Sequence, residues 1–187
     1  MSRRRLALAS VAVFTVLCVV GVSILAVTSG GSALAYEVNG NRTSQQTVDD
    51  VLRDLADANG TKQASTTPGS IDSRATAQVL TLGIARDVLA DAAERRGVTI
   101  TKADRRQAQE SVGDQLVQYP ASYRNLILDL RAHGGALGLT SDDQLNSFLA
   151  KQFQRADVRV DPHYGRWHPK IGVCPPTGCA SITQTTG

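Results

Sequence analysis

Apolar positions recur with helical spacing in five stretches of the chain after residue 35. The longest runs from Ile71 to Arg96, where two neighbouring stripes of aliphatic side chains predict a helix that is buried on several sides. This stretch holds no proline, and Gly97 follows its last charged turn, where a left-handed residue often ends a helix. We therefore expect this long helix to form the centre of the fold.

Two shorter helices are predicted, one before and one after it in the chain. Thr43 and a glutamine three positions later form a capping box for a helix that ends at Gly60. Thr101 and an aspartate three positions later open the other helix. Pro120 ends this second helix, because proline lacks the amide hydrogen that helix continuation needs.

Two more helices are predicted near the carboxyl end. One covers about residues 121–133 and stops at Gly134 and Gly135. The other begins at Ser141, which forms a capping box with Gln144. Both carry an apolar stripe on one face, so we expect both to pack around the long helix.

Short segments in which apolar and polar residues alternate predict two strands. One lies at 36–38, before the turn residues Asn39 and Gly40, and the other lies at 158–160. We expect the two strands to pair and so to bring the ends of the domain together. The predicted fold class is mainly α, with about five helices and a short two-stranded β ribbon that joins the ends of the domain.

The first 35 residues have the features of an export signal. Three arginines precede an uncharged apolar run from Leu6 to Val27, which is long enough to cross a hydrocarbon core of about 30 Å. The small residues around Leu34 suit signal peptidase, so cleavage between Ala35 and Tyr36 is one expectation. The other is retention of the run as a membrane anchor. In both cases we expect an extracytoplasmic domain, either secreted or membrane-anchored.

Charge and composition narrow the class of protein. The arginines at positions 3–5 account for the whole formal net charge of +3, so the exported part is neutral. It has no basic face with interleaved aromatic residues, which argues against nucleic-acid binding. We expect one domain over residues 36–172, packed mainly by aliphatic side chains, and a loop and flexible tail over residues 173–187.

The sequence carries no motif of an enzyme. It lacks a Gly-x-Ser-x-Gly elbow, a His-Glu-x-x-His motif and a phosphate-binding loop, so we expect no catalytic residues, no enzymatic activity and no cofactor. The spacing of His163, His168, Cys174 and Cys179 is one that zinc accepts. In an exported protein the two cysteines favour a disulfide instead, so no metal is expected. Zinc binding and a redox-active cysteine pair are the alternatives.

The order of these motifs resembles the amino-terminal chaperone domain of the SurA and PrsA-type extracytoplasmic foldases. A strand ends in Val38-Asn39-Gly40, a capped helix and a long helix follow, and Gly97 begins a Gly-aliphatic-x-aliphatic-Thr pattern with Asp104 beyond it. The segment 161–167 is similar to the final strand of actinobacterial members. The resemblance covers most of the exported domain.

This resemblance implies a chaperone-like holdase that binds unfolded or extended segments of exported proteins. Residues 134–140 could not hold the parvulin domain that many relatives carry, so prolyl isomerase activity is not implied. The alternative is a non-catalytic envelope adaptor or structural module with one dedicated protein partner. Five apolar side chains are candidates for contact with a client, although each could instead belong to the core: Leu126, Ile127, Leu130, Phe148 and Phe153.

Overall fold

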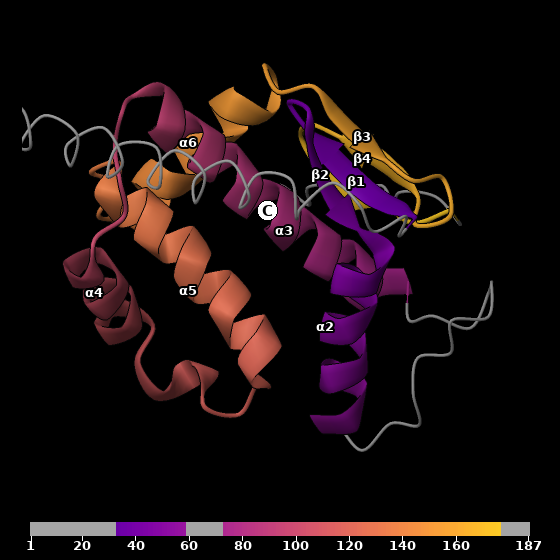
Figure 1. Cartoon of the computed structure of the whole chain (residues 1–187), viewed down its shortest axis with the longest axis horizontal. Helices are drawn as coiled ribbons and strands as arrows, with labels where there is room; N and C mark the ends of the chain where they lie inside the picture. Colours follow the sequence, from indigo (N-terminus) through magenta and orange to yellow (C-terminus); the bar gives the residue numbers. More distant parts are fainter. Residues whose placement is uncertain (1–32, 59–72, 177–187) are drawn as a thin grey trace, which may run out of the picture. The chain divides into compact units, whose positions relative to one another are not determined.

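A computed structural model of the protein describes residues 33–58 and 73–176. This part of the chain contains five α-helices and five short strands, which confirms the predicted fold class (Figure 1). No helix within these residues is both long enough and apolar enough to span a membrane. In chain order the elements are β1 (Leu34–Val38), β2 (Asn41–Ser44), α2 (Gln45–Ala58), α3 (Ser73–Arg95), α4 (Lys102–Val112), the 3₁₀ turn η1 (Gly113–Leu116), α5 (Ala121–Ala136), α6 (Asp142–Phe153), β3 (Val158–Val160), β4 (Arg166–His168) and β5 (Gly172–Cys174).

The first strand pairs with both of its neighbours and joins the two ends of the domain. β1 lies between β2 and β3, and all pairings are antiparallel. Tyr36 lies opposite Val160, which confirms the predicted ribbon. The ribbon gains β2 as a third strand, because Asn39 (φ 50°) and Gly40 (φ 90°) have the positive dihedral angles of a two-residue hairpin turn.

The hairpin also shifts the start of the first helix. The prediction that Thr43 caps this helix is wrong, because Thr43 lies in β2 opposite Tyr36. The hydroxyl of Ser44 instead accepts a hydrogen bond from the amide of Thr47 at 3.2 Å. Thr43 and Ser44 could each cap the helix, and the pairing of β2 with β1 leaves this role to Ser44. The predicted end at Gly60 lies outside the described residues.

Helix α3 forms the centre of the fold, as predicted. It contacts α2, α5, α6, β1 and β5, and its Leu80, Ile84 and Leu89 are completely buried (Figure 1). The helix ends as expected at Gly97, which has a φ of 65°. The amides of Gly97 and Val98 donate to carbonyl groups of the last turn, so the end of this helix is closed by its own backbone.

Two predicted helix ends differ in the structure. Helix α4 stops at Val112 and a 3₁₀ turn follows, so Pro120 does not end this helix. Pro120 instead occupies the N-cap of α5, where no amide hydrogen is needed. Helix α5 continues through Gly134 and Gly135, and the left-handed residue that follows it is Gly138, with a φ of 79°.

Gly134 lies inside α5 because α6 packs closely there. A Cβ atom at this position would lie 3.2 Å from the Cδ1 atom of Leu145, on α6. The predicted capping box of α6 is confirmed, since Ser141 and Gln144 bond each other's backbone amides. Gly134, which suggests a helix end in the sequence, thus serves helix packing in the fold, whereas Gly135 has open space at its Cβ position.

Strands β4 and β5 form a second sheet, which the alternation of apolar and polar residues did not indicate. The amide of Val173 donates to the hydroxyl of Thr81 on α3 at 3.0 Å, and the side chain of Val173 is buried. β5 covers residues 172–174, so the domain boundary that the sequence predicted between residues 172 and 173 falls inside this strand. This small sheet adds a further layer against the central helix.

Candidate functional site

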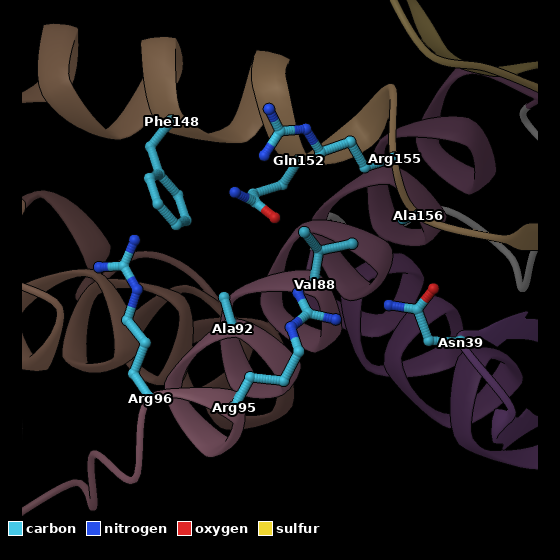
Figure 2. Close-up of a pocket in the computed structure, with 9 residues that line it drawn as sticks. All are labelled: Asn39, Val88, Ala92, Arg95, Arg96, Phe148, Gln152, Arg155 and Ala156. Carbon is cyan, nitrogen blue, oxygen red and sulfur yellow. The ribbon is translucent and has the colours of Figure 1, made fainter.

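A cavity of about 380 Å³ opens between α3 and α6, and we call it the α3–α6 pocket (Figure 2). Its volume lies near the lower end of the range of roughly 300–1,000 Å³ that is typical of ligand sites. Figure 2 shows side chains from both helices and from the β1–β2 turn directed around the same space. The lining residues are Asn39, Val88, Ala92, Arg95, Arg96, Phe148, Gln152, Arg155 and Ala156.

Three apolar side chains form the floor of the pocket, whose accessible lining is otherwise mostly polar. Val88 and Ala92 lie one helical turn apart on α3, and both are almost fully buried. Phe148 comes from α6 and is half-buried. The guanidinium carbon of Arg96 lies 5.2 Å from the centre of the Phe148 ring, a distance at which a cation is attracted to an aromatic face. Arg96 is therefore held beside the floor.

Three arginines give the pocket a positive rim. Arg95 forms an ion pair with Asp91, which lies one turn earlier on α3. Among the described residues, neither Arg96 nor Arg155 has a carboxylate within salt-bridge distance. Both side chains are exposed. The rim therefore retains positive charge that the described part of the protein does not neutralise.

Asn39 links the pocket to the hairpin turn. Its side-chain amide donates to Asp91 at 2.6 Å, and its Oδ1 atom accepts a hydrogen bond from the amide of Asp157 at 2.9 Å. Its backbone amide also donates to the carbonyl group of Asp157. The sequence identified Asn39 as a turn residue, but no local pattern indicated that it would hold Asp91 beside Arg95.

The five candidate client residues do not line one groove. Phe148 lines the α3–α6 pocket, whereas Leu126 and Leu130 are buried members of the hydrophobic core. Ile127 is half-buried against that core. Phe153 packs edge-on against Trp167, with the ring centres 5.0 Å apart. The arginines of the rim were not predicted as site residues, because charged residues at helix ends are common on solvated surfaces.

A second cavity, of about 170 Å³, lies between α2, α3 and α5 and has the Tyr36 side chain in its wall. The Tyr36 hydroxyl donates to Asp87 at 2.9 Å. Burial and the Asp87 carboxylate raise the pKa of Tyr36 well above its ordinary value of 10.0. A Cβ atom at Gly83 would lie 2.5 Å from this hydroxyl, so the glycine makes room for the tyrosine. These groups satisfy one another, and we interpret them as structural.

A third cavity, of about 450 Å³, lies beside the link between α3 and α4 and is mostly apolar. His133 reaches it from α5, and its Nδ1 atom is buried without a hydrogen-bond partner in the described part of the protein. Burial lowers the pKa of His133, so the neutral ring is favoured. Glu94 also lines this cavity, and the charges of Asp129 and Arg86 act on the pKa of the imidazole in opposite directions.

The expected signal-peptidase site lies within folded structure. Ala35 and Tyr36 are buried in the middle of β1. The carbonyl group of Ala35 accepts from the amide of Asp161 at 2.9 Å, and that of Ala33 accepts from the amide of Gln45 at 2.7 Å. Residues 33–35 thus contribute to the sheet, and cleavage before Tyr36 would remove them from the mature protein.

The cysteine and histidine residues near the carboxyl end do not form a metal site within the described chain. Cys174 is disulfide-bonded, while Cys179, its expected partner, lies outside the described residues. No group of three or more His, Cys, Asp or Glu side chains in the described ranges is arranged to hold a metal ion. His163 instead packs against the ring of Tyr164.

Comparisons with known proteins add no relative. No family model matches the chain, and no curated protein or solved structure matches it either. The resemblance to extracytoplasmic foldases therefore stays a prediction that rests on the motifs of the sequence. The α3–α6 pocket is the feature of the structure from which a function can be proposed.

Proposed function

We propose that this protein is a non-catalytic, chaperone-like protein that binds unfolded or extended segments of exported proteins in the α3–α6 pocket. The observation that carries the proposal is an open cavity with an apolar floor and a hydrogen-bonding, positively charged rim. An extended segment offers both apolar side chains and unpaired backbone groups, so this combination suits it. Prolyl isomerase activity is not part of the proposal.

The floor and the rim supply two different kinds of contact. The half-buried Phe148 can exclude water from an apolar side chain of the client, whereas Val88 and Ala92 are almost fully buried and expose little surface to it. Gln152 lies on the rim, and its amide can both donate to and accept from a peptide backbone. Such a site recognises a short segment in a non-native state without any bond being made or broken.

Two observations support an extracytoplasmic location. The chain begins with arginines and a long uncharged apolar run, which is typical of export. Cys174 is disulfide-bonded, and disulfides persist mainly in oxidising compartments. Together they favour clients among proteins that fold outside the cytoplasm.

An aggregation assay tests this proposal. We expect the protein to suppress aggregation of a urea-denatured secreted protein at near-stoichiometric amounts. Gln152→Trp should fill the pocket and weaken the suppression severalfold. Gln109→Trp, at an exposed position on α4 outside the pocket, serves as the matched control. A protein without any effect on aggregation would contradict the proposal, as would equal losses in the two variants.

A dedicated adaptor is the second candidate, and the small amount of exposed apolar surface favours it. The large hydrophobic residues that are exposed in the described part are Val117, Tyr119 and Ile171, and none of them lines the pocket. A general holdase is expected to expose a larger apolar patch. A photo-crosslinking residue placed at position 152 should capture many exported proteins if the protein is a holdase and one recurrent partner if it is an adaptor.

A further inference from the structure

We propose that the α3–α6 pocket selects protein segments that carry carboxylate groups next to an apolar side chain. This inference rests on the proposed function and specifies its ligand as an acidic peptide. Three features of the pocket support it: the charges of its lining, the backbone hydrogen bonds at the two helix ends, and the contacts that hold the guanidinium groups.

The charges around the pocket do not cancel. Arg95, Arg96 and Arg155 line it, and none of the lining residues is acidic. Asp91 lies next to the pocket and pairs with Arg95. Arg96 and Arg155 have no such partner among the described residues. A bound carboxylate would supply the negative charge that Arg96 and Arg155 lack, whereas a basic segment would be repelled by these arginines.

Arginines at the ends of helices often interact with free carbonyl groups, but that role is already filled here. At the end of α3, the amides of Gly97 and Val98 bond the carbonyl groups of Glu94 and Ala93. At the end of α6, the carbonyl group of Gln152 accepts from the two amides that follow at positions 155 and 156. Backbone amides thus satisfy carbonyl groups at both helix ends. Neither Arg96 nor Arg155 makes a side-chain hydrogen bond within the described residues, so both guanidinium groups remain available to a ligand.

Two of the arginines are held in place before a ligand arrives. The Phe148 ring holds Arg96, and Asp91 holds Arg95 while itself accepting a hydrogen bond from Asn39. Figure 2 shows Arg96 beside the ring and Arg155 across the pocket, on the side of α6. An apolar side chain on the floor would place flanking carboxylates near Arg96 and Arg155. Of these two contacts, the one with Arg96 is ordered in advance, which lowers the entropy lost on binding there.

Two labelled peptides test this selection on the full chain held in phosphatidylcholine nanodiscs. In one peptide glutamates alternate with leucines, and in the other glutamines replace the glutamates. We expect the glutamate peptide to bind about tenfold more tightly, because two exposed arginines each contribute a modest amount. Its affinity should fall as salt is added, whereas that of the glutamine peptide should change little.

A pair of charge-matched double variants locates the effect. Arg96→Gln with Arg155→Gln should lower the affinity for the glutamate peptide about tenfold and leave the glutamine peptide unaffected. Arg106→Gln with Arg166→Gln removes the same charge from exposed positions outside the pocket and should change neither affinity. Equal losses in both double variants would overturn the assignment, because the preference would then come from the overall charge.

Other outcomes separate this inference from the proposed function. If the protein suppresses client aggregation but binds the two peptides equally, the acidic preference is wrong and the proposed function stands. If it neither suppresses aggregation nor binds a peptide, both are wrong. If inorganic phosphate at the concentration of the glutamate peptide displaces it, the pocket is a general anion site and the peptide assignment is overturned.

Discussion

Two regions along α3 differ in how their polar groups are satisfied. In the first, which we call the Tyr36 contact (Tyr36, Thr43, Gly83 and Asp87), the tyrosine is 2% exposed and bonds Asp87, which also pairs with Arg86. In the second, the α3–α6 pocket, the arginines of the rim lie open to solvent. The first region uses its polar groups to stabilise the fold, and the second leaves them to a ligand.

This difference shows that charge alone does not identify a site. Asp87 and Arg86 are both ionisable and lie close to a cavity, yet they already form an ion pair with each other. Arg96 and Arg155 are more exposed and lack an internal carboxylate partner among the described residues. The useful criterion is whether a charged group that lines a cavity is already paired. Changes at the Tyr36 contact should therefore affect stability, and changes at the rim should affect binding.

The largest effect is expected from removal of the residues before Tyr36. A chain that begins at Tyr36 loses the carbonyl groups that bond Gln45 and Asp161, loses the buried Ala35, and places an amino-terminal charge within the sheet. We expect its free energy of unfolding to be about 3 kcal/mol lower than that of a chain that begins at Ala33. Urea denaturation of the two chains measures this difference.

Because the residues before Tyr36 stabilise the fold, we predict that the mature protein does not begin at Tyr36. Mass spectrometry of the protein from its own host should find either the retained leader or a cleavage upstream of Ala33. A mature chain that begins at Tyr36 and is as stable as the longer one would contradict our interpretation of β1.

The next largest effect is expected when Gly83 is replaced by alanine. The new methyl group would displace the Tyr36 ring and break its bond with Asp87, which should lower the free energy of unfolding by about 2 kcal/mol. Gly135→Ala on α5 is the control, because nothing lies within 4 Å of its Cβ position, and it should stabilise the protein slightly.

A double-mutant cycle can test this mechanism. Tyr36→Phe removes the hydroxyl nearest to the new methyl group, so Gly83→Ala should cost at least about 1 kcal/mol less in that background than in the wild type. Additive effects would show that the cost of the alanine arises elsewhere.

Alkaline pH should weaken the Tyr36 contact next. The pKa of Tyr36 is raised in the folded state by burial and by Asp87, so stability is fully present below the unfolded value of 10.0 and is lost as the pH rises toward the folded value. We expect the free energy of unfolding to fall by up to about 1.4 kcal/mol per pH unit from this group above pH 10.0.

Tyr36→Phe should reduce that slope but not abolish it. Burial and Asp49 also raise the pKa of Tyr164, so this phenol contributes a slope of the same sign. Denaturation curves collected at several alkaline pH values should therefore be flatter in the variant. Identical slopes in the variant and the wild type would mean that the ionisation of Tyr36 is not linked to folding.

A smaller effect is expected at Asn39, which connects the hairpin to the rim of the pocket. Asn39→Gly keeps a residue that tolerates positive φ but removes the side-chain hydrogen bonds to Asp91 and Asp157. The free energy of unfolding should fall by about 1 kcal/mol, and Arg95 should become less restrained. Asn39→Ala should cost more, because alanine does not favour that backbone conformation. Thermal denaturation of both variants checks this order.

The smallest change in stability is expected at the rim itself. Arg96→Gln combined with Arg155→Gln should alter the free energy of unfolding by less than about 0.5 kcal/mol, because both side chains are exposed and lack a carboxylate partner in the described structure. A loss as large as that in Gly83→Ala would remove the contrast between the two regions, since the arginines would then be structural.

Local patterns predicted much of the secondary structure. The capping pairs Thr101 with Asp104 and Ser141 with Gln144 form as expected, and Gly97 ends α3. These features depend on atoms only a few residues apart, so the sequence contains the required information. The pairing of the segments at 36–38 and 158–160 was also predicted, because alternation and position left few other partners.

Predictions from the local sequence were wrong where a long-range contact decides between two local conformations. Thr43 and Ser44 are both suitable caps, and the pairing of β2 with β1 selected Ser44. Gly134 looked like a helix end, but it lies inside α5, where Leu145 on another helix would be in tight contact with a larger residue. The apolar residues Leu126 and Leu130 could have faced a client or the core, and the packing of α5 on α3 buried them.

The sequence by itself determined the helices, the amino-terminal caps of α4 and α6, the glycine that ends α3 and the ribbon between the ends of the domain. It did not determine the α3–α6 pocket, whose residues come from a hairpin turn near position 39, the second half of α3, and α6 with the residues that follow it. No periodicity relates Asn39, Arg96 and Phe148, because their separation along the chain is far longer than any helical or strand repeat. Only the packing of the two helices against each other brought these side chains to one cavity and left two of the charges without partners.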